Sequence, residues 1–229
     1  FAMDHYNPLG LVRSLGEEGL QPIVIAERSK TNISSYSKYT KEYIPVETAQ
    51  EGYEVLLERF AHESNKPFLY TCDDRTIGFL DERYDEWKDL FIGFNAGKIG
   101  QISDYMDKFR ILEIAKKYGL KVLDTVCVDK GVVPENLEYP VITKSISPVV
   151  GGWKSDVHIC RSEQDLLNAY TRIKADKVII QKYIDKKNEY FIDGFCAQKG
   201  SIMFNSIETR YNYLIPGYYS PFMTVKNFN

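Results

Sequence analysis

The first hundred residues alternate between two hydrophobic periods. Apolar residues that recur every three or four positions predict amphipathic helices, and short continuous apolar runs between them predict strands. Helix, strand, helix, strand is typical of a parallel, wound α/β sheet. Its first strand would lie before Asp4 and is cut short, which suggests a trimmed amino terminus. The expected elements are helices over residues 7–18 and 51–63 and strands over residues 20–26 and 67–72.

From about residue 101 the pattern changes to longer helices and more strands. Asn7 predicts the N-cap of the first helix of the chain, whereas Asp104 and Ser162 predict the N-caps of two later ones. The last twenty residues, rich in proline and tyrosine, look irregular. The elements expected here are helices over residues 105–118 and 163–174 and strands over residues 121–128, 139–146, 156–160, 177–184, 189–196 and 201–207.

Composition narrows the class of protein. With 44% hydrophobic and 14% aromatic residues, the 229-residue chain can build real cores. A net charge of −3 disfavours a nucleic-acid binder, which usually carries a basic surface. No apolar run approaches the length of about 18 residues that a membrane span needs. The four cysteines and three histidines are scattered, so we expect no zinc site and a reduced, cytoplasmic protein.

A lysine followed by a glycine pair is the most informative feature. Lys144 lies inside an otherwise apolar strand, where a cation is costly to bury unless an anion meets it. Gly151 and Gly152 follow in a loop with Lys154 and Ser155, and such a loop can bring backbone N–H groups close to phosphate oxygens. This pattern favours a nucleotide polyphosphate site. The alternative is an edge-strand lysine followed by an ordinary hairpin turn.

Two further segments could complete such a site. The apolar strand over residues 177–184 ends in polar residues, and Glu189 follows, so it could present backbone groups to an adenine and a carboxylate to a ribose. The alternative is a plain core strand with solvated charges after it. Asp107 and Lys108 open a predicted helix, where a charged pair is usually solvated.

Two other motifs are set aside. Residues 93–99 (GFNAGKI) hint at a P-loop, but the spacing is wrong and no Ser or Thr follows Lys98. Asp73 and Asp74 look like a carboxylate pair for acid–base work. We interpret them instead as a strand-end turn lining the substrate cleft, or as the cap of the next segment.

Taken in order, these features resemble the ATP-grasp superfamily, which includes D-aspartate ligase and carbamoyl phosphate synthetase. The ordered set is a helix opening with Asp-Lys, a lysine-bearing strand, a glycine loop, a capped helix, the segment VIIQKYI and a downstream Glu, over residues 104–207. The resemblance implies an α/β fold, α+β in its second part. It divides into a pre-ATP-grasp domain (residues 1–100), a first ATP-grasp subdomain (101–178) and an incomplete second one (179–229).

The resemblance also implies roles for individual residues. Lys108 and Lys144 would be the two nucleotide-phosphate lysines, and the loop around Gly151 and Gly152 the phosphate cover. Glu189 would hold the ribose, with Asp185 as its rival. The remaining implied ATP-binding residues are Lys154 and Ser155 in the loop, and Gln181, Lys182, Tyr183 and Ile184 in the hinge against the adenine. Many members have Glu where this chain has Gln181, whose amide oxygen could still accept from the adenine.

The implied activity is that of a carboxylate–amine ligase, with ATP and a small carboxylate as its partners. ATP would phosphorylate the carboxylate, and an amine would attack the acyl phosphate; an amino acid or peptide is the preferred substrate. Members hold Mg²⁺ through acidic residues whose counterparts we expect beyond Asn229, so no metal ligand is named and the chain alone should be inactive. Arg210 is the one catalytic candidate, or half of a surface pair with Glu208.

Two readings compete with the ligase. The first is a non-catalytic ATP- or metabolite-binding α/β module, which the missing metal ligands favour. The second is a structural domain that binds no nucleotide. The resemblance also allows a homodimer, because many members of the superfamily dimerise.

Overall fold

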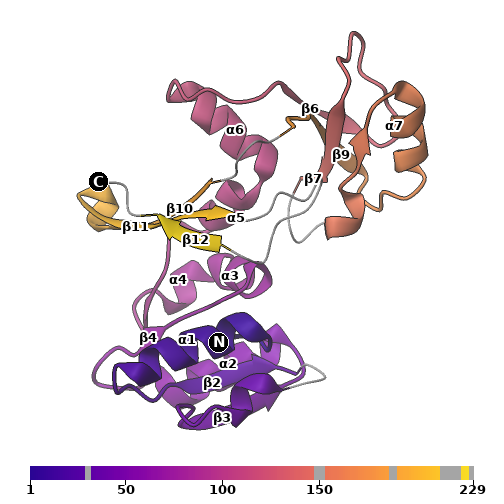
Figure 1. Cartoon of the computed structure of the whole chain (residues 1–229). Coiled ribbons are helices and arrows are strands. Elements are labelled where there is room, and N and C mark those ends of the chain that lie inside the picture. Colours follow the sequence, from indigo (N-terminus) through magenta and orange to yellow (C-terminus); the bar gives the residue numbers. More distant parts are fainter. Residues whose placement is uncertain (29–31, 147–152, 186–189, 212–222, 227–229) are drawn as a thin grey trace. The chain divides into compact units, whose positions relative to one another are not determined.

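The computed structural model describes residues 1–28, 32–146, 153–185, 190–211 and 223–226. Figure 1 shows the chain, which divides into two compact units. Of the described residues, those from Phe1 to Leu120 form the first unit, and those from Lys121 to Lys226 form the second. The three-part division drawn from the sequence at residues 100 and 178 stays a prediction.

The first unit is the wound α/β fold that the hydrophobic pattern predicts. It holds a parallel sheet of order β1-β2-β3 and a second parallel pair, β4-β5. In chain order its elements are β1 (Ala2–Met3), α1 (Tyr6–Glu17), β2 (Ile23–Glu27), η1 (Ile33–Tyr36), β3 (Glu42–Val46), α2 (Ala49–Phe60), β4 (Phe68–Leu69), α3 (Asp74–Asp81), α4 (Tyr84–Trp87), β5 (Ile92–Gly93), α5 (Gln101–Met106) and α6 (Lys108–Lys117).

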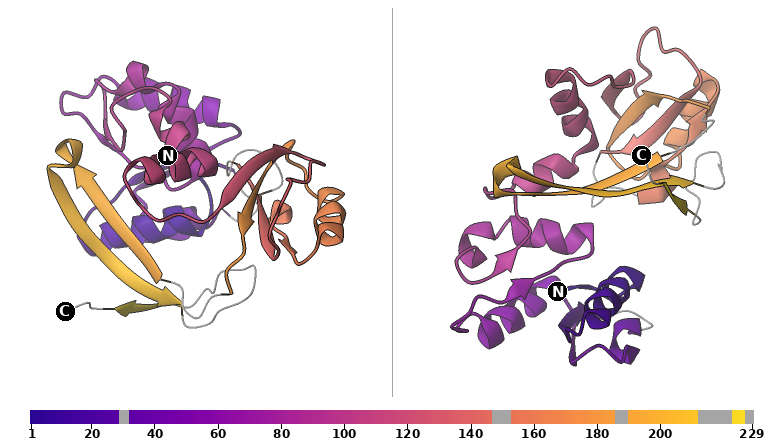
Figure 2. Two further views of the ribbon diagram at one scale, coloured as in Figure 1. Left: turned by 90° about the horizontal axis from the view of Figure 1, so that it is seen from above. Right: turned by 60° about the vertical axis from the view of Figure 1, so that its left-hand side comes forward.

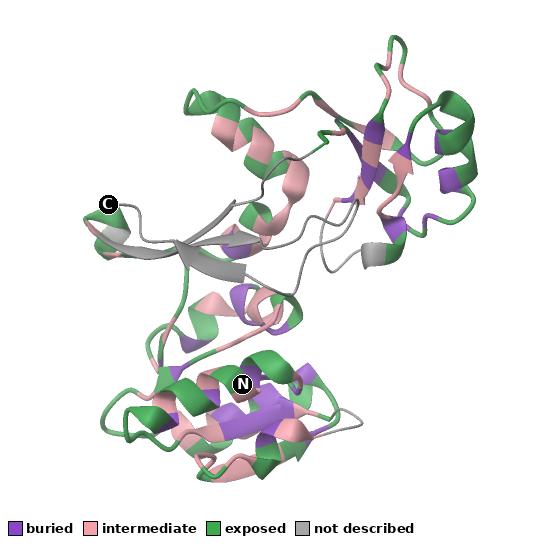
Figure 3. Cartoon of the chain, viewed as in Figure 1, coloured by how far each residue is buried: buried purple, intermediate pink, exposed green. Residues whose placement is uncertain are grey.

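Strand β2 is buried on both faces, and its residues alternate between two hydrophobic clusters (Figure 3). Val24 and Ala26 pack with Val12 of α1. Ile25 points the other way, into the larger cluster that contains Leu56 of α2. Helices therefore cover both faces of this sheet, as expected for parallel strands. The larger cluster consists of Ile25, Val46, Tyr53, Leu56, Leu69, Leu80, Trp87 and Phe91.

Two predicted helix starts were wrong. Helix α1 is capped by His5, whose side chain accepts from the N–H of Asn7, so Asn7 lies inside the helix. The long helix expected over residues 105–118 is interrupted at Asp107, whose backbone is extended (φ −67°, ψ 116°). Asp107 caps α6, and Asp104 lies within α5.

Replacing Asp107 by alanine should lower the free energy of unfolding of the first unit by about 1 kcal/mol. Its Oδ1 accepts from the N–H groups of Phe109 and Arg110, both at 2.8 Å, and alanine leaves these donors without that partner. Urea denaturation followed by circular dichroism measures the loss. The matched control is Asp104→Ala, which removes only an exposed ion pair with Arg110. Equal losses in both variants would contradict the assignment of the cap.

The second unit contains two antiparallel sheets. The first, of order β6-β9-β7-β8, carries α7, and the second has the order β10-β11-β12 (Figure 2). Its elements are β6 (Thr125–Asp129), β7 (Val141–Ser145), η2 (Trp153–Asp156), β8 (Ile159–Cys160), α7 (Glu163–Tyr170), β9 (Lys177–Lys182), β10 (Tyr190–Ala197), η3 (Gln198–Gly200), β11 (Ile202–Tyr211) and β12 (Met223–Lys226).

The predicted cap of α7 is confirmed, and the irregular end of the chain is corrected. Ser162 accepts from the N–H of Asp165 at the start of α7. Within the last twenty residues, β11 reaches Tyr211, and Met223–Lys226 forms β12 on its edge. A four-residue strand is specified by its partner rather than by its own pattern, which is why the sequence did not predict it.

Candidate functional site

Lys144 and Gln181 come together on one face of the four-stranded sheet. Strands β7 and β9 are antiparallel, with Lys144 opposite Ile179 and Ile142 opposite Gln181. Lys144 and Gln181 are therefore diagonal neighbours, a separation that long side chains can span. The ammonium Nζ of Lys144 donates to Oε1 of Gln181 at 2.8 Å. The lysine that the sequence singled out thus lies beside the hinge strand.

A chain of hydrogen bonds continues from Gln181 to strand β6. The side-chain Nε2 of Gln181 donates to Oγ1 of Thr125 at 2.9 Å, and that hydroxyl donates to the carbonyl of Leu123 at 2.8 Å. Thr125 lies directly opposite Gln181 in the β6–β9 pair. Gln181 is only 8% exposed, so its amide is held at both ends inside the protein. We call Lys144, Gln181 and Thr125 the polar chain.

The opposite face of this sheet is the hydrophobic core of the unit. Val141 on β7 and Val178 and Ile180 on β9 pack with residues of α7. Thr143 on the same side is fully buried; it donates to the carbonyl of Asp156 at 2.9 Å and accepts from the N–H of His158 at 3.0 Å. One face of the sheet therefore supplies stability, and the other presents the polar chain.

Asp156 anchors the chain immediately after the predicted phosphate loop. It is fully buried, and its two carboxylate oxygens accept from the N–H groups of Lys174 at 2.9 Å and Ala175 at 3.2 Å. The far end of the loop is thereby fixed to the connection between α7 and β9. Gly151 and Gly152 lie outside the described residues, as does the side chain of Lys154. Ser155 is exposed beside Asp156.

In the hinge segment, the backbone amides of Lys182 and Tyr183 are hydrogen-bonded within the protein. The N–H of Lys182 donates to the backbone carbonyl of Asp124 at 3.0 Å, and the N–H of Tyr183 donates to the backbone carbonyl of Pro140 at 2.9 Å. The side chain of Lys182 is exposed and forms an ion pair with Glu138 at 3.4 Å.

The other hinge and acidic candidates are less informative. Ile184 and Asp185 are exposed. Glu189 and the side chain of Arg210 lie outside the described residues. The roles given to these four residues stay predictions.

Lys108 belongs to the first unit, where it is half-buried at the start of α6. Burial lowers the pKa of its ammonium, and the carboxylates of Asp74 and Asp107 partly offset this by raising it. Lys108 is therefore not the fully solvated residue of the alternative interpretation. The carboxylates of Asp74 and Asp107 already lie near this cation, and its assignment as a phosphate lysine stays a prediction.

Asp73 is a capping residue, as one interpretation of the Asp73–Asp74 pair predicted. It accepts from the N–H of Thr76 at 2.8 Å at the start of α3 and from the N–H of Met3 at 2.9 Å. Within the described part of the chain, no group of three or more His, Cys, Asp or Glu residues could hold a metal ion. No helix among the described residues is long and apolar enough to span a bilayer.

Two residues of the site escaped the sequence analysis. Asp156 was visible only as the residue after the loop, and Thr125 lies in a strand with no distinguishing motif. The buried position of Asp156 and the pairing of Thr125 with Gln181 depend on tertiary structure. No sequence signal for Thr125 could have been used.

Several solved structures share the fold of this chain. No protein-family model matches the sequence. The L-amino acid ligase from Bacillus licheniformis is similar in structure, with a TM-score of 0.69 and 12% identity over 92% of this chain and 49% of the ligase. The N5-carboxyaminoimidazole synthetase from Staphylococcus aureus, complexed with ADP, has a TM-score of 0.67 and 16% identity over 93% of this chain and 54% of its own.

A third neighbour is the N5-carboxyaminoimidazole synthase from Aspergillus clavatus, in complex with ADP and 5-aminoimidazole ribonucleotide. Its TM-score is 0.64, with 14% identity over 93% of this chain and 53% of its own. This chain thus spans about half the length of each of these proteins. At 12–16% identity these likenesses show the fold alone, and the α/β fold expected from the resemblance is confirmed.

Proposed function

We propose that this chain is the nucleotide-binding part of an ATP-dependent ligase that activates a carboxylate as an acyl phosphate for attack by an amine. The observation that carries the proposal is the contact of Lys144 with Gln181. It brings the predicted phosphate lysine to the predicted adenine strand, on the face of the sheet opposite its core. The shared fold with ligases crystallised with ADP supports a nucleotide as the ligand.

The residues of the site can be assigned to parts of the nucleotide. Lys144 would meet phosphate oxygens, because a cation beside the transferring group offsets the charge that develops on it. The loop ending at Asp156 would cover the phosphates and keep water from the acyl phosphate. Since the amides of Lys182 and Tyr183 are already bonded, adenine contacts would fall to the amide of Ile184 and to carbonyl groups of the hinge.

The proposal also includes a metal ion and a class of substrate. ATP chemistry of this kind uses Mg²⁺ to neutralise phosphate charge. The described residues include no metal-binding group, so we assign no residue to the ion. An amino acid or peptide is the proposed carboxylate, and the similarity to an L-amino acid ligase supports it.

Titration calorimetry of the chain with ADP tests the nucleotide site. We expect saturable binding with a dissociation constant below about 1 mM, corresponding to a binding free energy beyond about −4 kcal/mol. The same titration with inorganic phosphate should give far weaker binding, because phosphate lacks the base and ribose. Absence of ADP binding would contradict the nucleotide site altogether.

A non-catalytic nucleotide-binding module is the second candidate, favoured by the lack of a metal-binding group among the described residues. The two candidates differ in turnover. In the protein as it occurs naturally, ADP release that depends on an added amino acid supports the ligase. Nucleotide binding without ADP release, in the presence of Mg²⁺ and a panel of amino acids, supports the module.

A further inference from the structure

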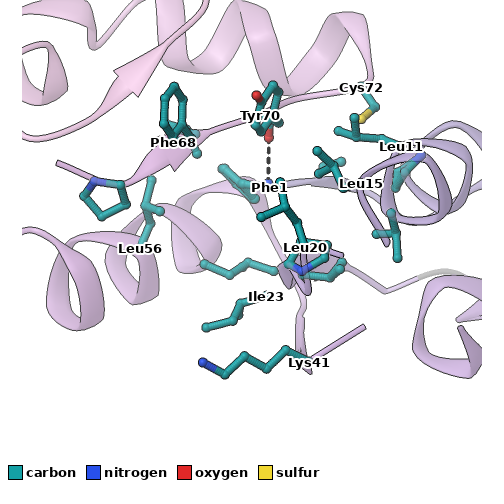
Figure 4. Close-up of a pocket in the computed structure, with 18 of the residues that line it drawn as sticks. Phe1, Leu11, Leu15, Leu20, Ile23, Lys41, Leu56, Phe68, Tyr70 and Cys72 are labelled. Atoms are coloured by element: carbon teal, nitrogen blue, oxygen red, sulfur yellow. Dashed lines mark hydrogen bonds between the residues drawn. The ribbon is translucent and has the colours of Figure 1, made fainter. Parts of the chain in front are cut away.

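An apolar cavity with a volume of about 610 Å³ lies in the first unit (Figure 4). Leu11, Leu15 and Phe68 are among the side chains that line it. The hydrogen bond drawn in Figure 4 joins two residues of the protein, since the amino group of Phe1 donates to the carbonyl of Tyr70 at 2.8 Å. Ligand sites gain their specificity from a few precisely placed polar groups. The polar chain of the second unit supplies such groups, so it says more about a ligand than this cavity does.

The chemistry of its two ends determines the direction of every hydrogen bond in the polar chain. At one end, the ammonium of Lys144 has donors and no acceptor, so Oε1 of Gln181 must accept from it. At the other end, the carbonyl of Leu123 only accepts, so it receives the hydroxyl proton of Thr125. The oxygen of Thr125 is then left to accept, and Nε2 of Gln181 donates to it.

The amide of Gln181 therefore has one orientation that satisfies both of its neighbours. If the amide were turned over, its NH₂ group would face the ammonium of Lys144, and the two donors would repel each other. Gln181 is 8% exposed, so little water can reach the amide to replace a lost partner. The orientation of this amide is thus set from two sides, by Lys144 and by Thr125.

The hydroxyl group of Thr125 needs an explanation other than the strand itself. Thr125 lies at the start of the edge strand β6, directly opposite Gln181. Threonine and valine have nearly the same shape, and both suit a strand because they are β-branched. A valine would fit β6 as well, but it would offer Nε2 of Gln181 no acceptor. What distinguishes threonine at this position is the acceptor that it provides for the amide.

We propose that Thr125 is a positioning residue of the nucleotide site. Its hydroxyl oxygen holds the amide of Gln181 with Oε1 toward Lys144, and the amide in turn holds the ammonium where phosphate oxygens are to meet it. Thr125 acts through Gln181 rather than by touching the ligand. The inference rests on the proposed function, because it takes Lys144 as the residue that meets the phosphates.

Thr125→Val tests this role, because it replaces the hydroxyl by a methyl group of similar size. We expect ADP to bind about threefold to tenfold more weakly, the range that corresponds to one neutral hydrogen bond. Thr125→Ala removes the same acceptor without adding a methyl group and should give a similar loss. Thr125→Ser keeps the hydroxyl and should restore the affinity. Titration calorimetry measures the affinities, and thermal unfolding checks that each variant is folded.

Thr171→Val is the matched control. The hydroxyl of Thr171 also donates to a nearby backbone carbonyl, that of Asn168 at 2.8 Å. Thr171 is exposed at the end of α7, the helix on the core side of the sheet. Its replacement removes the same kind of bond outside the polar chain and should leave the ADP affinity within about twofold. An equal loss of affinity in Thr171→Val and Thr125→Val would contradict the proposal.

A double-mutant cycle with Lys144→Ala separates positioning from a purely structural effect. If Thr125 acts through Lys144, Thr125→Val should cause no further loss of ADP affinity in a chain that lacks the lysine side chain. A loss by the same factor in both backgrounds would overturn the positioning role and leave the nucleotide site intact. Absence of ADP binding by the unchanged chain would instead overturn the proposed function, and the positioning role with it.

Nuclear magnetic resonance gives a readout that needs no nucleotide. The side-chain amide protons of Gln181 should exchange slowly with solvent in the unchanged chain, because the amide is buried and hydrogen-bonded. In Thr125→Val their exchange should become faster, because the acceptor is lost. Rapid exchange in both chains would show that Thr125 does not hold the amide, and the positioning role would then be wrong.

Discussion

Lys144→Ala is expected to weaken ADP binding by about tenfold to a hundredfold, because a hydrogen bond to a charged group contributes about 1.5–3 kcal/mol. The fold should survive the change. Lys144 lies on the face of β7 opposite the core, and the residues that pack with α7 stay intact. Calorimetry gives the affinity and thermal unfolding checks the fold.

Lys177→Ala is the matched control for this variant. Lys177 lies on the adjacent strand β9 and is exposed at its start, opposite Asp129 of β6 and away from Gln181. Its replacement removes the same charge and should leave ADP affinity within about twofold, since an exposed charge in water interacts weakly at a distance. An ADP affinity of Lys144→Ala equal to that of Lys177→Ala would remove Lys144 from the proposed site.

Trp87→Ala is expected to lower the free energy of unfolding of the first unit by about 3–5 kcal/mol. Trp87 is 2% exposed and belongs to the larger cluster of that unit. Its indole N–H also donates to the carbonyl of Leu80 at 2.8 Å. Alanine therefore leaves a large cavity and removes one of the donors of the Leu80 carbonyl, which still accepts from the N–H of Arg83 at 3.1 Å. Urea denaturation followed by far-ultraviolet circular dichroism, a backbone signal that does not need the indole, measures the effect.

Phe94→Ala provides the comparison within the same unit. Phe94 is 61% exposed, so the variant removes an aromatic ring without opening a core cavity. Its cost should stay within about 0.5 kcal/mol, the usual range for surface changes. A loss as large as that of Trp87→Ala would show that exposure in the folded chain does not govern stability here.

Long periodic segments were predicted from the sequence, whereas short and context-dependent ones were not. The helix near residues 51–63 and the strand near residues 177–184 are present with shifted ends, as α2 and β9. Strand β3 was not predicted because Pro45 interrupts it; an edge strand tolerates that proline, since its N–H side need not pair. The break at Asp107 was also missed, because the apolar pattern runs through it.

In the candidate site, too, some features were predicted from the sequence and others were not. Lys144 and Gln181 were both singled out, but their contact depends on the register between β7 and β9, which the alternation of residues alone does not specify. Thr125 joins them only through the pairing of β6 with β9. The sequence therefore predicted which side chains carry charge and polarity, and the sheet determined which of them meet.

The polar chain has a consequence for how a ligand would be captured. Gln181 accepts from the ammonium of Lys144, and its own amide donates to Thr125. A long side chain that is already ordered has less rotational freedom to lose, a saving of about 0.5–1.5 kcal/mol for each side chain that would otherwise be immobilised. The sheet thus preorganises the Lys144 ammonium for an anion. Part of the conformational entropy that ligand binding would otherwise cost is lost already when the protein folds.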